Sequence, residues 1–141
     1  MAAERRDLVA ALEAAVHRVL DLLASELADL ELTHGEINAL AALASEGAAV
    51  TVASLQRATG QRASTLTGVL DRLERRGLAE RALNPADRRS FVVTLTDTGS
   101  AAGARVRQLF AALEREVANG IRPDALNGFF AVIDRLEELT E

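Results

Sequence analysis

The sequence predicts a mainly α fold with a small β-wing, in which a winged helix-turn-helix is flanked by long helices. Apolar residues recur every three or four positions at both ends of the chain, which is the period of an amphipathic helix. In the middle, Gly60 separates two short helical patterns, as the turn of a helix-turn-helix requires. Two short segments with alternating apolar residues follow, joined by turn-forming and basic residues.

The N-terminal segment predicts one long helix from about Asp7 to Leu30. Its apolar stripe is wider than a single surface helix needs, so we expect burial on two sides. The stripe consists of Leu8, Val9, Leu12, Val16, Val19, Leu20, Leu23, Leu27 and Leu30. A capping box at Thr33 and Glu36 predicts a second helix from about His34 to Ser45, which Gly47 ends.

The helix-turn-helix is predicted between Thr51 and Arg76. Thr51 can cap a helix over about Val52–Thr59, and the second helix runs over about Arg62–Arg76. The link before Thr51 is either irregular or a single strand that pairs with the later hairpin. One face of the second helix is apolar, and the opposite face is small and polar in its N-terminal half, which permits close approach to base edges. The apolar face consists of Leu66, Val69, Leu70 and Leu73.

The hairpin and the C-terminal helices complete the predicted fold. Strands are expected over Leu78–Leu83 and Ser90–Leu95, with Phe91, Val93 and Leu95 on one side and a projecting Asn84–Arg89 loop between the strands. Thr96 and Asp97 then start a helix that ends near Ala118, before Asn119 and Gly120. Pro123 begins a last helix that ends near Thr140 and carries an apolar seam.

The charge is unevenly distributed. The net charge is −5, yet the stretch from Arg57 to Arg89 holds eight of the sixteen arginines and four acids, a local balance of +4 that leaves −9 for the remainder. An acidic protein with one basic patch is compatible with DNA binding. An ordinary solvated helix face is the alternative interpretation of the same arginines.

Composition excludes several classes of function. The chain has no cysteine, so disulfides, thiol sensing and cysteine-based zinc sites are excluded. No catalytic triad order and no phosphate-binding glycine loop is present, so we expect neither an enzyme nor a bound cofactor. His17 and His34 are interpreted as structural residues and no metal site is expected. The N-terminus lacks a signal-peptide core, and a cytoplasmic protein is expected.

Three segments carry a resemblance to a known family. They are Leu73–Arg81 (LERRGLAER), Asn84–Arg89 (NPADRR) and Val93–Gly99 (VTLTDTG). Together they resemble the signature of the MarR family of bacterial transcriptional regulators. The first motif is common to many winged helices, whereas the Asp-Arg-Arg wing followed by Leu-Thr-x-x-Gly is much more specific. The resemblance covers nearly the whole chain, most strongly from Leu66 to Gly99.

The resemblance implies a homodimer that binds pseudo-palindromic promoter DNA, with repression as the expected sign. Residues 1–32 and 100–141 would be dimerisation helices, and residues 33–99 the winged helix-turn-helix. The resemblance also implies release by a small aromatic or anionic effector. The alternative is a helical dimer that serves as a protein-interaction module or antirepressor without binding DNA.

The resemblance also assigns residues to the DNA site. Base edges would be faced by Ser64, Thr65, Thr67 and Gly68 on the recognition helix. Phosphates would be contacted by Arg62, Arg72, Arg75 and Arg88. Arg89 would reach the minor groove, with Asp87 supporting the wing through an ion pair. Two positions depart from the family pattern: Gly68 stands where many relatives carry a basic side chain, and Gln61 where an apolar residue is usual.

Overall fold

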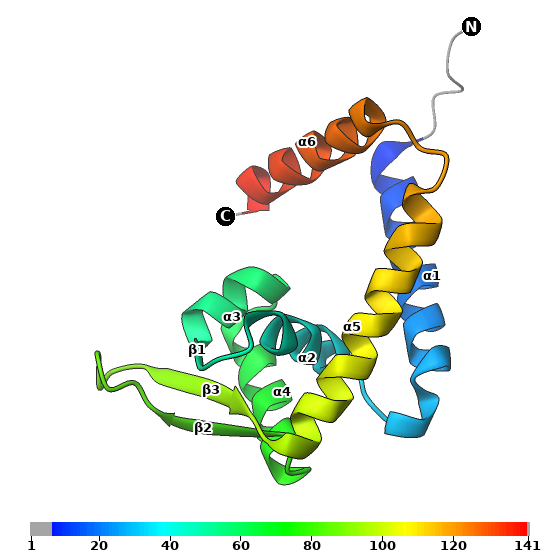
Figure 1. The fold of residues 1–141 in the computed structure, drawn as a ribbon. Coiled ribbons are helices and arrows are strands. Elements are labelled where there is room, and N and C mark those ends of the chain that lie inside the picture. Colours follow the sequence, from blue (N-terminus) through cyan, green and yellow to red (C-terminus); the bar gives the residue numbers. More distant parts are fainter. Residues whose placement is uncertain (1–6, 141) are drawn as a thin grey trace, which may run out of the picture. The chain divides into compact units, whose positions relative to one another are not determined.

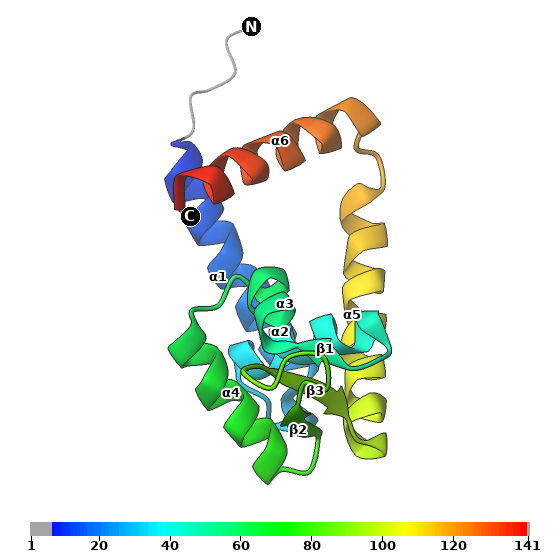
Figure 2. The same ribbon diagram turned by 90° about the vertical axis from the view of Figure 1, so that its left-hand side faces the viewer.

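A computed structural model describes residues 7–140 and confirms the mainly helical fold with a small wing. The chain divides into two compact units, one up to Arg107 and one from Gln108 onward. In the first unit, the hairpin of β2 (Ala79–Leu83) and β3 (Phe91–Leu95) extends from the cluster of α2 (His34–Glu46), α3 (Val52–Thr59) and α4 (Ala63–Arg75) (Figure 1). Figure 2 shows α2 between α4 and α5 (Asp97–Ala118), so that α4 lies at the outside of this unit.

The first helix, α1 (Leu8–Glu26), is shorter than predicted. Asp7 caps its start, but the helix ends at Glu26 and a 3₁₀ turn over Ala28–Leu30 replaces the last predicted turn. Leu27, whose side chain is buried, leaves the helical conformation at φ −109° and ψ 19°. The chain therefore bends toward α2 while it keeps the apolar side chain of Leu27 in the core.

Local capping signals position α2, α3 and α4. The predicted capping box of α2 (His34–Glu46) is present, with the Glu36 amide donating to Thr33 Oγ1 at 3.3 Å and the Thr33 amide to Glu36 Oε2 at 3.4 Å. Thr51 caps α3 (Val52–Thr59), as predicted. Gly60 then takes φ +67°, a left-handed conformation that glycine adopts without steric cost, and α4 (Ala63–Arg75) follows.

Within the described residues, three antiparallel strands form the wing sheet in the order β1-β3-β2. The link before α3 forms β1 (Val50–Thr51), which pairs with β3 (Phe91–Leu95), and β3 pairs with β2 (Ala79–Leu83). Val93 is buried, but Phe91, which the alternation places on the same side of the strand, is 47% exposed. The outer half of the hairpin extends beyond the core that would have covered this side chain.

The core of the first unit lies between α2, α3, α4 and the sheet. All four predicted inward residues of α4 are buried. The largest fully buried side chains are Ile37, Leu40, Leu43, Leu55, Leu66, Val69, Leu70, Leu73, Val93 and Val106. Since α4 buries one face completely, its opposite face is held rigidly at the surface.

Both predicted C-terminal helices are present. Helix α5 (Asp97–Ala118) begins in the first unit and ends in the second, and α6 (Pro123–Thr140) follows a turn in which Gly120 has φ +80°. The second unit leaves large apolar side chains exposed, namely Val117, Ile121, Phe129, Phe130 and Leu139. No helix in the described part of the chain is long and apolar enough to cross a membrane.

Candidate nucleic-acid interface

The outward face of α4 carries small polar side chains. Ser64, Thr65 and Thr67 are exposed and Gly68 is partly exposed. The Thr67 hydroxyl donates to the Ala63 carbonyl at 2.9 Å, which keeps this side chain close to the helix. The exposed surface of α4 is therefore narrow and carries hydroxyl groups, and such a surface fits the width of a DNA major groove.

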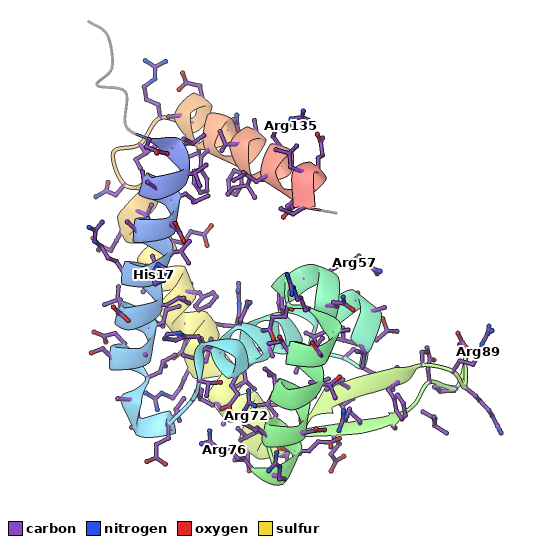
Figure 3. The ribbon with its side chains drawn as sticks, turned by 180° about the vertical axis from the view of Figure 1, so that it is seen from behind. His17, Arg57, Arg72, Arg76, Arg89 and Arg135 are labelled. Carbon is purple, nitrogen blue, oxygen red and sulfur yellow. The ribbon has the colours of Figure 1, made fainter. Side chains whose placement is uncertain are left out.

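The wing tip is held by hydrogen bonds within its turn. The Asn84 amide donates to the Ser90 carbonyl at 2.9 Å and closes the loop. Asp87 Oδ1 accepts from the Arg89 amide at 3.1 Å and from Arg89 Nε at 3.4 Å. The Arg89 side chain is nevertheless 93% exposed, and Figure 3 shows it at the end of the hairpin. Together with the exposed Arg88, it places two cations at the tip.

An arginine on β2 connects the wing to α4. Arg81 Nε and Nη2 each donate to a Glu74 oxygen at 3.0 Å, and Nη2 also donates to Asp71. The Arg81 amide adds a bond of 2.9 Å to Glu74 Oε1. These hydrogen bonds from Arg81 hold the pKa of the Glu74 carboxyl below its usual value of 4.5, against the opposing effects of partial burial and the Asp71 charge. The wing and the outward face of α4 are thus fixed relative to each other.

This connection predicts a pH-dependent contribution to stability. A carboxyl whose pKa is lower in the folded state stabilises the fold above its unfolded pKa, and this contribution is lost as the pH falls through the folded pKa. We therefore expect Glu74→Gln to lower the free energy of unfolding at pH 7, and the difference from wild type to shrink below pH 4.5. Urea unfolding at several pH values measures it.

The matched control is Glu80→Gln on the same strand as Arg81. Glu80 is exposed and forms no ion pair within residues 7–140, so its replacement should leave both the stability and its pH dependence nearly unchanged. If the free energies of unfolding of Glu74→Gln and wild type differ by the same amount from pH 7 to the acid limit, Glu74 does not stabilise the fold through its charged pair with Arg81.

A buried carboxylate lies behind α4. Glu36 on α2 is 2% exposed, and its two oxygens accept from Arg72 Nε at 3.0 Å and from Arg76 Nη1 at 3.2 Å. Arg76 also donates to the carbonyls of Leu30 and Glu31, in the link between α1 and α2. Figure 3 shows Arg72 and Arg76 at the C-terminal end of α4. The cluster ties α4 to α2 and to the preceding link.

The structure brings the expected DNA-site residues onto the first unit. Arg62, the residue before α4, is exposed, and Arg75 is exposed while its Nε donates to the Asp71 carbonyl at 3.3 Å. Arg72 is the exception, since its guanidinium is bonded to Glu36. Sequence reasoning missed the structural roles of Glu36, Arg76 and Arg81. The capping box at Thr33 singled out Glu36, but nothing local indicated its partners.

Gln61, a polar residue where the family pattern has an apolar one, forms a hydrogen bond to α2. Its Nε2 donates to the Gly35 carbonyl at 3.1 Å, whereas Oε1 is buried and accepts no hydrogen bond from the described residues.

Within residues 7–140, no cluster of three or more possible metal ligands occurs. His17 is exposed and bonds through Nδ1 to the carbonyl of Glu13 in its own helix.

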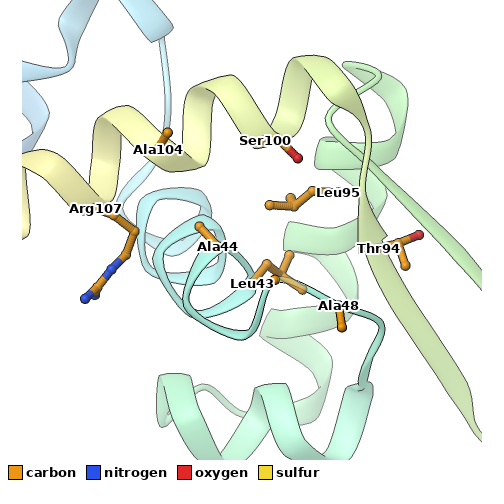
Figure 4. A pocket seen from close by; sticks show the side chains of 9 residues that line it. Leu43, Ala44, Ala48, Thr94, Leu95, Ser100, Ala104 and Arg107 are labelled. Atoms are coloured by element: carbon orange, nitrogen blue, oxygen red, sulfur yellow. The ribbon is translucent and has the colours of Figure 1, made fainter.

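Two of the pockets in the first unit lie beside α5. One, of about 290 Å³, lies beside α2, β3 and the start of α5, with Leu43, Leu95 and Ala104 in its walls and Arg107 at one end (Figure 4). The other, of about 380 Å³, lies between the α1–α2 link, α5 and the start of β2. Its lining includes the apolar Leu30, Leu32, Leu78 and Ala101, the basic Arg76 and Arg105, and the acidic Asp29, which pairs with Arg105.

Known proteins share this arrangement. A family model described as MarR family matches residues 28–90. A MarR family transcriptional regulator from Silicibacter pomeroyi is 27% identical, with a TM-score of 0.71 over 89% of this chain and 84% of that one. A Staphylococcus aureus MepR–DNA complex is 16% identical, with a TM-score of 0.80 over 97% of this chain and 100% of that one.

A third structure concerns Bordetella bronchiseptica BpsR, whose DNA binding is regulated by 6-hydroxynicotinic acid. It is 22% identical, with a TM-score of 0.75 over 97% of both chains. At this identity BpsR and MepR are similar to this chain in fold. The family match lies over the helix-turn-helix and most of the wing, where the interface residues also lie. The helix-turn-helix and most of the wing therefore match the MarR family, and the chain as a whole shares the fold of solved transcriptional regulators of that family.

Proposed function

We propose that the protein is a sequence-specific repressor that binds pseudo-palindromic promoter DNA as a homodimer in the cytoplasm. The observation that carries this proposal is the fixed pairing of the polar face of α4 with an arginine-tipped wing, joined through Arg81. A rigid helix and a projecting basic hairpin on one unit can occupy adjacent grooves of the same duplex. Occupancy of a promoter would block polymerase, so repression is the expected sign.

The proposed contacts follow from exposure and charge. Ser64, Thr65, Thr67 and the backbone at Gly68 face base edges, and Arg89 enters the minor groove with Asp87 holding its loop. Phosphates are contacted by Arg62, Arg72, Arg75 and Arg88. In a dimer the two α4 helices would read half-sites about one helical turn, 10–10.5 bp, apart.

Exposed apolar surface supports the dimer. In the first unit, α1 exposes Leu8, Val9, Val16, Val19 and Leu22, and in the second unit, α6 exposes Phe129, Phe130 and Leu139. Exposed apolar surface of this extent is typical of a protein–protein interface. We propose that residues 1–32 and 100–141 form the dimer, and that residues 33–99 bind the DNA.

A charge on α6 should separate the protomers. We expect Phe130→Asp to raise the dissociation constant of the dimer by about 100-fold or more, because a central aromatic anchor is removed and an unpaired charge is buried. Sedimentation equilibrium measures the change. The matched control is Leu83→Asp, an exposed leucine on the wing that should leave the dimer intact. A wild-type chain that is monomeric at tens of micromolar would contradict the proposal.

We further propose that a small anionic aromatic compound releases the DNA. The pocket that Arg76 and Arg105 line, about 380 Å³ in volume, combines apolar walls with two arginines, and an anion bound there would compete with Glu36 for Arg76 and with Asp29 for Arg105. Arg76 belongs also to the Glu36 cluster, so an anion that attracts it would disturb the support of α4. The test is to add aromatic carboxylates one at a time. A compound that both raises the melting temperature of the protein and lowers its affinity for DNA would identify the effector class.

Selection from a random duplex library tests the proposed specificity. The expected result is enrichment of one motif with two-fold symmetry and half-site centres about 10 bp apart. Tight binding without enrichment of any motif would contradict sequence-specific regulation. A protein that forms dimers but does not bind duplex would favour the interaction-module alternative.

A further inference from the structure

We propose that Glu36 is a positioning residue for DNA binding, which holds the guanidinium of Arg72 across Gly68 on the outward face of α4. This inference rests on the proposed DNA contacts and extends them to a residue of another helix. Glu36 itself, on α2, contacts no DNA. It acts through Arg72, which supplies the cation that α4 lacks at position 68.

The first observation is the burial of Glu36. Among residues 7–140 it is the one buried charged side chain, at 2% exposure. A buried carboxylate is unfavourable unless ion pairs and hydrogen bonds satisfy it. Here, Oε1 accepts from Arg72 Nε at 3.0 Å, while Oε2 accepts from Arg76 Nη1 at 3.2 Å and from the Thr33 amide at 3.4 Å. Both oxygens are therefore engaged.

The second observation is that this carboxylate is fixed on several sides. The capping box at Thr33 fixes the start of α2, on which Glu36 lies. Arg76 is itself bonded to the carbonyls of Leu30 and Glu31. Glu36 thus has one orientation, and the Nε of Arg72 has one place to bind. The flexible Arg72 side chain acquires a defined position before any DNA arrives.

The third observation is the space at Gly68. A methyl group added there would meet only Nη1 of Arg72, at 3.5 Å. Residues four apart lie on the same face of a helix, and side chains lean toward its N-terminus. The guanidinium of Arg72 therefore lies over Gly68. It is held at Nε from the α2 side, while the Arg72 side chain remains 44% exposed for an outside partner.

These observations connect two features of α4 that the sequence alone leaves separate. Glycine at position 68 leaves the outward face without a side chain, and arginine at position 72 covers the same surface from one turn later. Fixing an arginine beforehand lowers the side-chain entropy that binding removes. The expected ligand of Arg72 is a DNA phosphate, because its Nη groups present two donors to one anion.

The direction in which Glu36→Gln changes DNA affinity distinguishes a positioning role of Glu36 from a simple effect of its charge. Glu36→Gln removes a negative charge near DNA, so charge alone predicts tighter binding to a phosphate backbone. The positioning role predicts the opposite, a weakening of about threefold, because Arg72 loses the carboxylate that orients it. We expect Arg72→Gln to weaken binding about fivefold and to lower the salt slope by about 0.9 per protomer.

A double-mutant cycle then tests whether Glu36→Gln weakens binding only through general damage to α2. If Glu36 acts through Arg72, Glu36→Gln should have almost no further effect once Arg72→Gln is present, and the double variant should bind about fivefold more weakly than wild type. General damage to α2 would instead weaken binding in either background. Fluorescence anisotropy with a mixed-sequence 30-bp duplex measures all four proteins, and circular dichroism confirms that each is folded.

Two further variants complete the experiment. Arg72→Lys keeps the charge but lacks the Nε donor, and it tests the proposal even where Glu36→Gln fails to fold; we expect it to bind almost as weakly as Arg72→Gln. Asp29→Asn, which removes a carboxylate paired with Arg105, should not weaken binding. Wild-type affinity in Arg72→Lys, tighter binding in Glu36→Gln, or additive effects would overturn the positioning role and leave the DNA-binding function intact. A wild-type protein that does not bind duplex would overturn both.

Discussion

Gly99→Ala is expected to lower the free energy of unfolding by about 3 kcal/mol or more, the largest stability effect of any glycine substitution in the chain. The methyl carbon would lie 1.7 Å from the Leu78 carbonyl oxygen and 2.7 Å from its carbon. This carbonyl also accepts from the Thr96 amide at 3.1 Å. The backbone of Leu78 is thus fixed where α5 begins, and the clash is relieved only by moving α5 away from the α4–β2 junction.

Urea unfolding at one fixed protomer concentration measures this effect, because the stability of a dimer depends on concentration. Gly68→Ala is the matched control in an exposed helix. It meets a single flexible side-chain atom at 3.5 Å and should raise stability by about 1 kcal/mol through helix propensity. If Gly99→Ala unfolds within about 1 kcal/mol of the wild type, the close packing of α5 on Leu78 is wrong.

The double variant Arg88→Ala and Arg89→Ala is expected to weaken binding to any duplex by about 10- to 100-fold and to lower the salt slope by about 0.9 for each phosphate that the wing no longer neutralises. Both arginines are exposed at the wing tip, and the Arg89 pair with Asp87 is itself exposed at 3.4 Å. Their removal therefore changes little in the fold, so the effect should appear in DNA affinity alone.

The control for the wing is Arg122→Ala, which removes an exposed arginine paired with Asp124, outside the proposed interface. Its affinity for duplex should equal that of wild type. Anisotropy titrations at several salt concentrations give both the affinity and the slope. An unchanged slope in the wing variant, with wild-type stability, would show that the wing does not contact phosphates.

The sequence predicted those parts of the fold that local chemistry decides. Thr33 and Thr51 cap α2 and α3 as predicted, and Gly47 and Gly60 take the positive φ angles that end these two helices. Each of these signals operates within about four residues, so a single sequence is enough to find it. The alternation around Val93 identified the hairpin for the same reason.

Features that depend on tertiary contacts were not predictable in this way. Glu36 forms hydrogen bonds with Arg72 and Arg76, which follow it by 36 and 40 positions in the sequence. No periodic sequence pattern links residues so far apart. The end of α1 at Glu26 depends on Leu27 reaching the core, whereas helical periodicity continues to Leu30. Phe91 has the alternation of an inward residue, but the hairpin extends past the core there. Burial in each case depends on what the rest of the fold provides.

The most direct test is to titrate the wild-type protein against the duplex recovered by selection and against a scrambled duplex of the same length and composition. The measurement is made at about 50 mM and 200 mM salt. Sequence-specific regulation predicts tighter binding to the selected duplex at both salt concentrations, and log affinity that falls steeply with log salt for both duplexes. Equal affinity for the two duplexes, or affinity that does not change with salt, would contradict it.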